Sequence, residues 1–281
     1  MNELGRVVCK TCPRQCSLAS GEIGFCRARR VVGSEVACSN YGRITSLALD
    51  PIEKKPLAFF HPGSNILSIG SYGCNMRCPF CQNDSISQCG ETDIAWRNFS
   101  PVEIADIAKS LVSSHRNIGL AYTYNEPLVG WEYVRDCARE TKKRDLANVL
   151  VSNGCASENV IRAIAPLIDA ANIDLKGASQ EYYNWLGGDF ESVCRTIKIL
   201  HEFGCHVEIT NLIVPGRNDK DEEIEAVADF LISVSDDIPL HITRFFPCWR
   251  MKNEQPTPIV DVYRLAEIAR RRLKRVMVGN V

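Results

Sequence analysis

The sequence lacks several features that would assign it to a broad class. Among its 281 residues, no apolar run approaches the roughly 20 residues that a membrane helix needs. Neither sign of charge is in excess, because 33 Lys and Arg residues face 34 Asp and Glu residues. A general nucleic-acid-binding protein usually carries a basic excess, so this class is disfavoured. Residues 1–6 contain no apolar signal region. We therefore expect a cytoplasmic protein with no membrane partner.

Cysteine, in contrast, is abundant. The chain has 14 cysteines, and seven of them fall into two tight clusters, Cys9 to Cys26 and Cys74 to Cys81. Disulfide frameworks occur mainly in short secreted chains, and an export signal is not evident here. In a reducing compartment, clustered cysteines more often bind metal or carry out redox chemistry. The clusters therefore predict two metal-binding sites.

The pattern after residue 65 predicts an α/β fold built on a parallel sheet. Six nearly continuous apolar runs are typical of strands that are buried on both faces. Helices with clear start signals separate them, and Ser100-Pro101-Val102-Glu103 is one such capping box. Six strand–helix units favour a partial (β/α)6 TIM-like barrel over a complete eightfold one. The predicted strands are Ile66 to Ser71, Ile118 to Tyr124, Asn148 to Ser152, Ala171 to Leu175, His206 to Val214 and Leu240 to Phe246.

The chain divides into three predicted parts. Residues 1–40 are a Cys-rich metal-binding segment with little apolar periodicity, which we call the knuckle. Residues 41–65 are a short β connector, interrupted by Asp50-Pro51 and by the turn at residues 61–64. Residues 66–281 form the partial barrel.

The loop after the first barrel strand is the strongest functional signal. Cys74, Cys78 and Cys81 form a C-x3-C-x2-C pattern. Three thiolates can hold three irons of a [4Fe–4S] cluster and leave the fourth iron open to bind and reduce a substrate. The alternative is a structural zinc loop that takes a distant fourth ligand.

Polar residues gather where the other predicted strands end, which is the functional edge of a parallel barrel. Some of them also have a purely structural interpretation. Glu126 could simply lie at the turn where a helix begins, and Asp174 and Lys176 could form a surface ion pair. His241 could be a hydrogen-bonded core residue. The residues at these ends are Asn125, Glu126, Ser152, Asn153, Asp174 and Lys176, and the fifth and sixth strands carry Asn211 and His241.

The cysteine loop, with Phe80 before its third cysteine, resembles the radical S-adenosylmethionine (SAM) superfamily signature. The resemblance implies a [4Fe–4S] cluster at Cys74, Cys78 and Cys81 whose open iron binds SAM. One electron then yields a 5′-deoxyadenosyl radical that abstracts hydrogen from a substrate. The chain resembles AmmeMemoRadiSam-system radical SAM enzymes, which are similar to pyruvate formate-lyase activating enzyme. The motifs are Cys9-x2-Cys12-Pro13-x2-Cys16, residues 50–57, 73–83, 122–127, 174–177 and 241–247.

This resemblance assigns the polar residues to SAM. It places Phe80 beside the cofactor, Asn125 and Glu126 at the SAM ammonium, and Asp174 and Lys176 in the SAM-contacting element of glycyl-radical activating enzymes. Ser152 and Asn153 are expected at the ribose, and Asn211 and His241 are further SAM contacts. The chain departs from the pattern because the glycines of a Gly-Gly-Glu element are absent before Glu126. It also ends at Val281, where relatives continue into a tail with another cysteine pair.

The knuckle cysteines leave the metal open. Cys9, Cys12, Cys16 and Cys26 supply four thiolates, which suit zinc or a saturated second [4Fe–4S] cluster, with disulfides as the third alternative. Cys155 and Cys248 each follow a predicted strand. Either could be a substrate-linked thiol or an extra cluster ligand.

The leading functional hypothesis is a radical SAM enzyme, an activating-enzyme-like oxidoreductase that acts on a protein, a peptide or a small molecule. Its expected partners are SAM, a one-electron donor such as flavodoxin or ferredoxin, and AmmeMemo partner proteins. A glycyl-radical enzyme activase is the alternative within this class. A non-catalytic iron–sulfur or zinc module for electron transfer or scaffolding is the alternative outside it.

Overall fold

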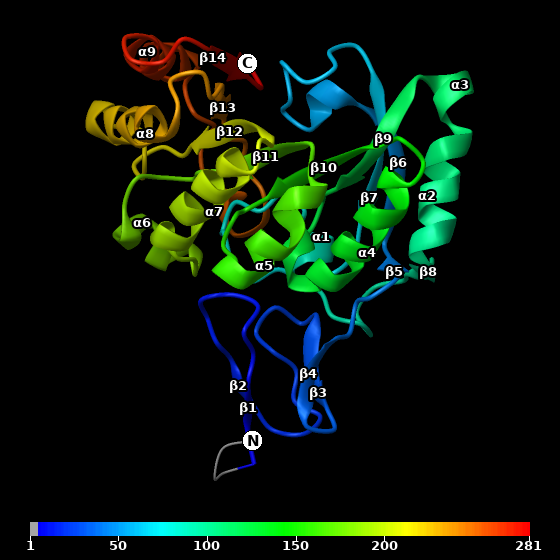
Figure 1. The fold of residues 1–281 in the computed structure, drawn as a ribbon. Helices are drawn as coiled ribbons and strands as arrows, with labels where there is room; N and C mark the ends of the chain where they lie inside the picture. Colours follow the sequence, from blue (N-terminus) through cyan, green and yellow to red (C-terminus); the bar gives the residue numbers. More distant parts are fainter. Residues whose placement is uncertain (1–4) are drawn as a thin grey trace.

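The computed structural model describes residues 5–281, and an eight-stranded sheet forms its centre (Figure 1). The strand order is β14-β13-β12-β11-β10-β9-β7-β6. All neighbours in this order run parallel except β6, which is antiparallel to β7. The strands are β6 (Ser46–Pro51), β7 (Asn65–Gly70), β9 (Asn117–Tyr122), β10 (Ala147–Ser152), β11 (Ala170–Asp174), β12 (His206–Ile213), β13 (Leu240–Arg244) and β14 (Val276–Gly279).

The predicted α/β fold with a mostly parallel sheet is confirmed. The six predicted strands are β7 and β9 to β13, and each end lies within two residues of its expected position. Two further strands extend the sheet at its edges. β6 lies in the segment that we expected to be a connector, and β14 was not expected. Both pair along strands that the sequence did identify, so their place in the sheet depends on tertiary contacts that local pattern does not show.

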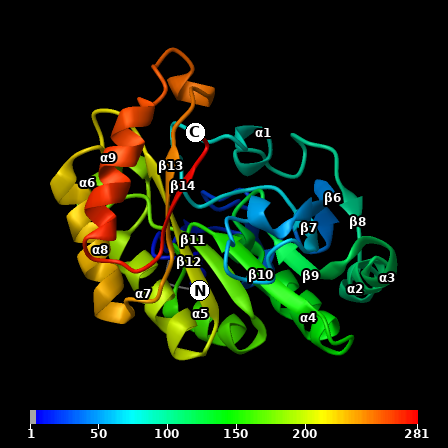
Figure 2. The same ribbon diagram turned by 90° about the horizontal axis from the view of Figure 1, so that it is seen from above.

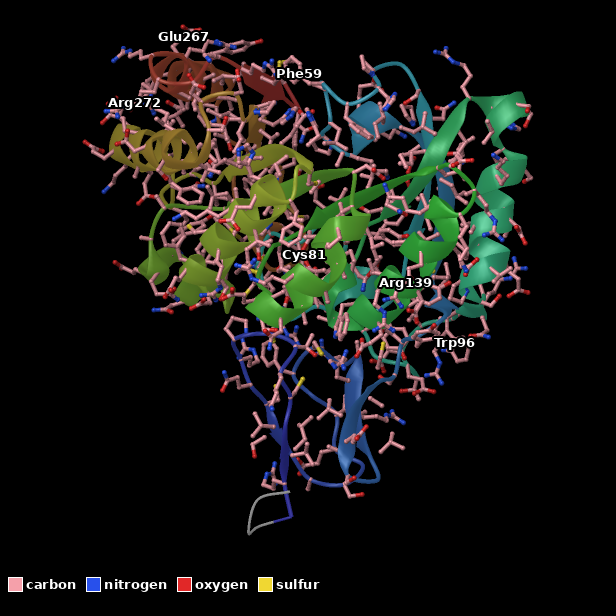
Figure 3. The ribbon with its side chains drawn as sticks, in the orientation of Figure 1. Phe59, Cys81, Trp96, Arg139, Glu267 and Arg272 are labelled. Carbon is pink, nitrogen blue, oxygen red and sulfur yellow. The ribbon has the colours of Figure 1, made fainter. Side chains whose placement is uncertain are left out.

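Helices cover the outer face of the sheet (Figures 1 and 2). Ser100 and Glu103 form both hydrogen bonds of the predicted capping box at the start of α2. Figure 3 shows charged side chains such as Arg139, Glu267 and Arg272 projecting from this outer layer, whereas Cys81 lies toward the middle of the molecule. The helices are α1 (Asp84–Ser87), α2 (Pro101–Ser110), α3 (Val112–His115), α4 (Trp131–Lys142), α5 (Glu158–Ile164), α6 (Gln180–Leu186), α7 (Phe190–Glu202), α8 (Asp221–Val234) and α9 (Ile259–Arg270).

The last helix has the expected apolar stripe. Val262, Leu265, Ala266, Ala269 and Leu273 are all buried, because residues three or four apart share one face of a helix. Among the helices of residues 5–281, none is long and apolar enough to cross a membrane.

The knuckle forms two small antiparallel hairpins that extend below the barrel in Figure 1. The first joins β1 (Val7–Val8) to β2 (Ser17–Leu18), and the second joins β3 (Arg29–Val32) to β4 (Glu35–Cys38). A separate pair, β5 (Arg43–Ile44) and β8 (Arg97–Asn98), follows it. Such short strands supply little buried surface, so the knuckle depends on its contacts with the barrel.

The segment between β6 and β7 fills the barrel interior. It begins with the 3-10 helix η1 (Ile52–Lys54), and its Ile52 and Leu57 are fully buried against Ile66, Val149 and other strand residues. The buried carboxylate of Glu208 holds this segment, because it accepts hydrogen bonds from the backbone N–H groups of Ala58 (3.0 Å) and Phe59 (2.8 Å).

Two histidines complete the surroundings of Glu208. The Nε2 atoms of His206 and His241 lie 2.9 and 2.6 Å from its two carboxylate oxygens. Burial alone would raise the pKa of Glu208, but these four partners favour the carboxylate and lower the pKa to about 2. Because this pKa lies below the ordinary value of 4.5, the ionised group stabilises the fold above pH 4.5. That contribution is lost as the pH falls toward 2.

Glu208→Gln removes this titration. Between pH 6 and pH 4 the unfolded wild-type chain takes up a proton that the folded chain does not, so wild type should lose roughly 1 kcal/mol more unfolding free energy than Glu208→Gln. Urea unfolding of the metal-free protein at several pH values measures this difference. Glu181→Gln, at an exposed position of α6, is the control and should follow wild type. Parallel pH profiles for Glu208→Gln and wild type would contradict the assignment.

Candidate active site

A cavity of about 290 Å³ opens where the parallel strands end. This size is close to the lower end of the range for small-molecule sites. The three cysteines of the loop after β7 share this cavity with most of the polar residues that were predicted from the strand ends. The predicted site residues that line it are Cys74, Cys78, Cys81, Phe80, Asn125, Glu126, Ser152, Asn153, Asp174 and Lys176.

The cysteine loop is held from both sides. Asn125 fixes its start, because its side-chain amide donates to the carbonyls of Tyr72 (3.2 Å) and Gly73 (3.0 Å) and its Oδ1 accepts from Ser71 N–H (2.9 Å). Arg77 donates to the carbonyl of Cys74 at 3.0 Å. Gly73 has φ +92°, and a Cβ there would lie 2.4 Å from the carbonyl oxygen of Cys26. Only glycine suits this position.

Hydrogen-bond donors surround the loop sulfurs. Cys74 Sγ accepts from the N–H of Met76 (3.4 Å) and lies 3.6 Å from Asn153 Nδ2, and Cys81 Sγ lies 3.2 Å from Ser87 Oγ. Burial raises the pKa of Cys78 to about 11, although the positive charge of Lys176 opposes the rise. A metal would therefore be needed to keep this thiol deprotonated at neutral pH.

Cys74, Cys78 and Cys81 are suited to be three ligands of a [4Fe–4S] cluster. Three thiols share one cavity, and donors to cluster sulfurs are the usual outer contacts of such sites. In the part of the chain that the structure describes, no three Cys, His, Asp or Glu side chains converge on one metal ion. The ligands of a cluster need not converge in this way, because each thiolate binds a different iron.

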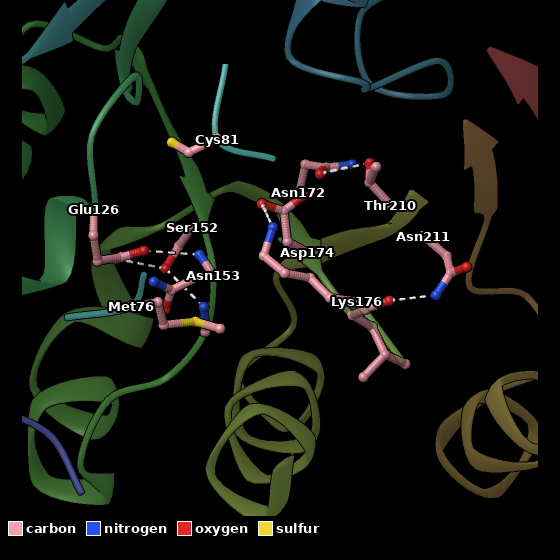
Figure 4. A network of polar contacts seen from close by, with 12 residues as sticks. Met76, Cys81, Glu126, Ser152, Asn153, Asn172, Asp174, Lys176, Thr210 and Asn211 are labelled. Atoms are coloured by element: carbon pink, nitrogen blue, oxygen red, sulfur yellow. Dashed lines mark hydrogen bonds and ion pairs between the residues drawn. The ribbon is translucent and has the colours of Figure 1, made fainter. Parts of the chain in front are cut away.

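Glu126 is the centre of a buried network (Figure 4). One carboxylate oxygen accepts from Leu128 N–H (2.9 Å) and Ser152 Oγ (2.7 Å), and the other accepts from Asn153 N–H (2.8 Å). Burial raises the pKa of Glu126 to about 7 in spite of these bonds. Glu126 also caps the 3-10 helix η2 (Pro127–Gly130), so the helix-entry interpretation holds together with a place in the cavity wall.

Asp174 and Lys176 form an ion pair at the cavity, with 2.9 Å between Asp174 Oδ2 and Lys176 Nζ. Lys176 Nζ also lies 5.8 Å from the centre of the Phe80 ring. Burial would lower the pKa of Lys176, but Asp174 and the Cys78 thiolate raise it, so the ammonium stays charged. The pair is better shielded than an ordinary surface ion pair, because only 13% of the lysine side chain is exposed. Two residues before Asp174, Asn172 accepts a hydrogen bond from Thr210 at 2.9 Å (Figure 4).

Two predicted SAM contacts do not line the cavity. Asn211 donates to the carbonyl of Leu175 at 2.6 Å, on the face of β12 opposite to its cavity-lining neighbours Thr210 and Leu212. His241 is hydrogen-bonded to Glu208. Thr243, two residues after His241, does line the cavity. The roles of Asn211 and His241 stay predictions that the observed positions do not support. The alternation of side chains along β12 would have indicated Thr210 in place of Asn211. On β13, Thr243 shares a face with His241 but lies nearer the end of the strand, where the cavity opens.

Cys155 and Cys248 also lie outside this cavity. Cys155 is buried and lines a separate cavity of about 400 Å³ beside Cys12 and Asn75. Cys248 Sγ donates to the carbonyl of Phe80 at 3.0 Å, and Phe80 directly precedes Cys81. Sequence alone gave both positions near the strand ends, but it did not show which cavity they face.

Glu126→Gln should destabilise the protein. The side-chain N–H group of glutamine would face a donor whose hydrogen bond the carboxyl group now accepts. Two donors would then oppose each other, which should lower the unfolding free energy by about 2 kcal/mol. Urea unfolding of the metal-free protein at pH 4, where the Glu126 carboxyl of the folded protein is neutral like the glutamine amide, measures the change. Glu181→Gln should stay within about 0.5 kcal/mol of wild type. Equal stability of the two variants would show that Glu126 is not a structural acceptor.

Comparison with known protein families gives an independent result. Residues 68–231 match the family model of the radical SAM superfamily. An uncharacterised protein of Methanocaldococcus jannaschii is 36% identical over 278 residues, which cover 98% of this chain and 82% of that protein. The pyruvate formate-lyase 1-activating enzyme of Escherichia coli is 26% identical over 167 residues, or 56% of this chain. The matched region spans 65% of that enzyme.

Solved structures share the fold. SuiB of Streptococcus suis superposes with a TM-score of 0.58 and 14% identity over 75% of this chain and 48% of its own. A radical SAM methyltransferase of Sphaerobacter thermophilus gives a TM-score of 0.56 and 14% identity over 78% of this chain and 67% of its own. At such identities the likeness establishes the fold and does not extend to substrate.

Proposed function

The chain belongs to the radical SAM superfamily, and we propose that it is a radical SAM enzyme whose Cys74, Cys78 and Cys81 hold a [4Fe–4S] cluster. The observation that carries this proposal is the set of three cysteines in one cavity with Glu126 and the Asp174–Lys176 pair. When bound and reduced, the cluster supplies the electron that splits SAM into methionine and a 5′-deoxyadenosyl radical, which takes a hydrogen atom from a substrate.

The residues of the chain bind and orient SAM. Glu126 is fixed by three hydrogen bonds, and its carboxylate suits the SAM ammonium. Lys176 offers a buried positive charge for the SAM carboxylate, while Asp174 fixes the position of that charge. Phe80 and the enclosing strands exclude water from the reacting atoms. The donors at the Cys74 and Cys81 sulfurs would stabilise negative charge on these thiolates and so tune the reduction potential of a bound cluster.

Release of 5′-deoxyadenosine tests the proposal directly. Anaerobically reconstituted wild type, incubated with SAM and dithionite, should produce it, and Cys78→Ala should lose at least about 100-fold of this activity because one cluster ligand is gone. Chromatography of the reaction mixture measures the product.

Cys89→Ala is the matched control for this variant. Cys89 lies outside the cavity and should tolerate the change with full activity. If wild type with intact cluster content releases no 5′-deoxyadenosine, the enzyme proposal fails and the electron-transfer or scaffold module takes its place.

Lys176→Gln tests SAM binding. Loss of the buried positive charge should weaken SAM binding about tenfold or more, since about 1.4 kcal/mol corresponds to a factor of ten. Equilibrium dialysis with reconstituted protein measures the dissociation constant. Lys143→Gln, whose side chain is 67% exposed, is the charge-matched control. Unchanged affinity in Lys176→Gln would remove this residue from the SAM site.

The substrate is a protein, a peptide or a small molecule. The similarity to the E. coli activating enzyme supports a glycyl-radical activase as the alternative within this class. An activase leaves a persistent organic radical on its partner protein, visible by electron paramagnetic resonance, whereas a metabolite enzyme turns over without one. A donor such as flavodoxin or ferredoxin would supply the electron. AmmeMemo partner proteins and a cytoplasmic location stay predictions.

A further inference from the structure

The knuckle carries four free thiols that the active site does not use. Cys9 and Cys16 face each other where the β1–β2 ladder continues, with Cys9 N–H donating to the carbonyl of Cys16 at 2.9 Å. Cys12 lies at the turn between them, where its carbonyl accepts from Gln15 N–H at 3.2 Å. Cys26 is buried and lies close enough to Cys9 and Cys12 for their charges to act on it. The four thiols therefore occupy one region of the knuckle.

This region packs directly on the cysteine loop of the active site. The carbonyl oxygen of Cys26 lies against Gly73, where even a Cβ has no room, and Gly73 is the residue before the ligand Cys74. Arg77 Nη2 donates to the carbonyl of Phe25 at 2.6 Å, and Phe25 precedes Cys26. Cys12 lies beside Asn75 in the cavity of about 400 Å³. The two sets of cysteines are thus in contact through their immediate neighbours.

Unpaired positive charge collects at the same interface. The guanidinium carbons of Arg14 and Arg77 lie 3.5 and 4.0 Å from the centre of the Phe25 ring. Within residues 5–281, no carboxylate pairs with Arg14, Arg27 or Arg77, and Arg27 Nη1 is buried without a hydrogen-bond partner. Arg14 and Arg77 donate only to backbone carbonyls in the described chain, so an anion at this interface would lower their mutual repulsion.

We propose that Cys9, Cys12, Cys16 and Cys26 ligate a second [4Fe–4S] cluster that relays electrons to the cluster at Cys74, Cys78 and Cys81. This inference rests on the proposed function. Four thiolates around a 2+ core leave a net charge of about −2, which the arginines Arg14, Arg27 and Arg77 offset. Zinc would give the same charge, but zinc has no redox chemistry and would make no use of the contact with the active-site loop.

The relay moves one electron and no atoms. A one-electron donor of the flavodoxin or ferredoxin class reduces the knuckle cluster from the 2+ to the 1+ state. Passing that electron to the active-site cluster restores the 2+ state, so the knuckle cluster is unchanged after each transfer. Cys12 and Cys16 are partly exposed, so a donor can approach this cluster from solvent.

Metal content of the wild-type protein is the first test. Anaerobically reconstituted wild type should contain about eight irons and eight sulfides per chain, Cys16→Ala about four, and Cys38→Ala about eight. Cys38 belongs to the knuckle but not to the four thiols, so it controls for damage to this segment. One zinc with about four irons in wild type would overturn the inference, as would about four irons alone.

Electron paramagnetic resonance and donor dependence are the second test. Dithionite-reduced wild type should show the broadened signal of two interacting clusters, and Cys16→Ala a single narrow one. Because dithionite can reduce the active-site cluster directly, Cys16→Ala should still release 5′-deoxyadenosine with dithionite. With reduced flavodoxin, its rate of 5′-deoxyadenosine release should be at least about tenfold lower than that of wild type. Equal flavodoxin-driven rates in wild type and Cys16→Ala would overturn the relay and leave the proposed function intact. If wild type releases no 5′-deoxyadenosine with either reductant, the result counts against the proposed function itself.

Discussion

The buried carboxylate of Glu126 is the interaction on which the arrangement of the site depends. Its oxygens accept from the end of β10, at Ser152 and Asn153, and from the first turn of η2. Asn153 in turn donates to Asn75 at 3.0 Å, within the cysteine loop. A single acid therefore connects β9, β10 and the loop that carries the cysteines. Because a buried carboxylate must have its hydrogen bonds satisfied, these elements have little freedom to move independently.

The barrel interior is divided between structure and chemistry. On the side where the strands begin, residues 52–64 fill the space with Ile52 and Leu57 and are anchored by Glu208. Lys55 is buried in this segment and lies 2.7 Å from Asp50, whose carboxylate also accepts from Tyr124 Oη at 2.5 Å. Tyr124 and Pro56 both reach the cavity wall. The inserted segment therefore forms the floor of the site and limits its depth.

The sequence contained the information for the strands and for the cysteines, but not for every side-chain direction. Continuous apolar runs located β7 and β9 to β13, because strands buried on both faces cannot tolerate unpaired polar residues. The spacing of Cys74, Cys78 and Cys81 located the site. Strand ends, in contrast, were judged by sequence position rather than by which face a side chain takes. Asn211 was assigned to the cavity for that reason, although β12 turns it away. His241 was assigned by resemblance to activating enzymes, although it lies nearer the start of β13 and is bound to Glu208.

The carboxyl-terminal end of the described chain has a practical consequence. Asn280 lines the cavity, one residue before Val281, which is 53% exposed. The start of β1 lies at the far tip of the knuckle instead (Figure 1). An affinity tag fused after Val281 would emerge at the rim of the site and compete there with an incoming molecule. The opposite end is the safer point of attachment for purification or immobilisation.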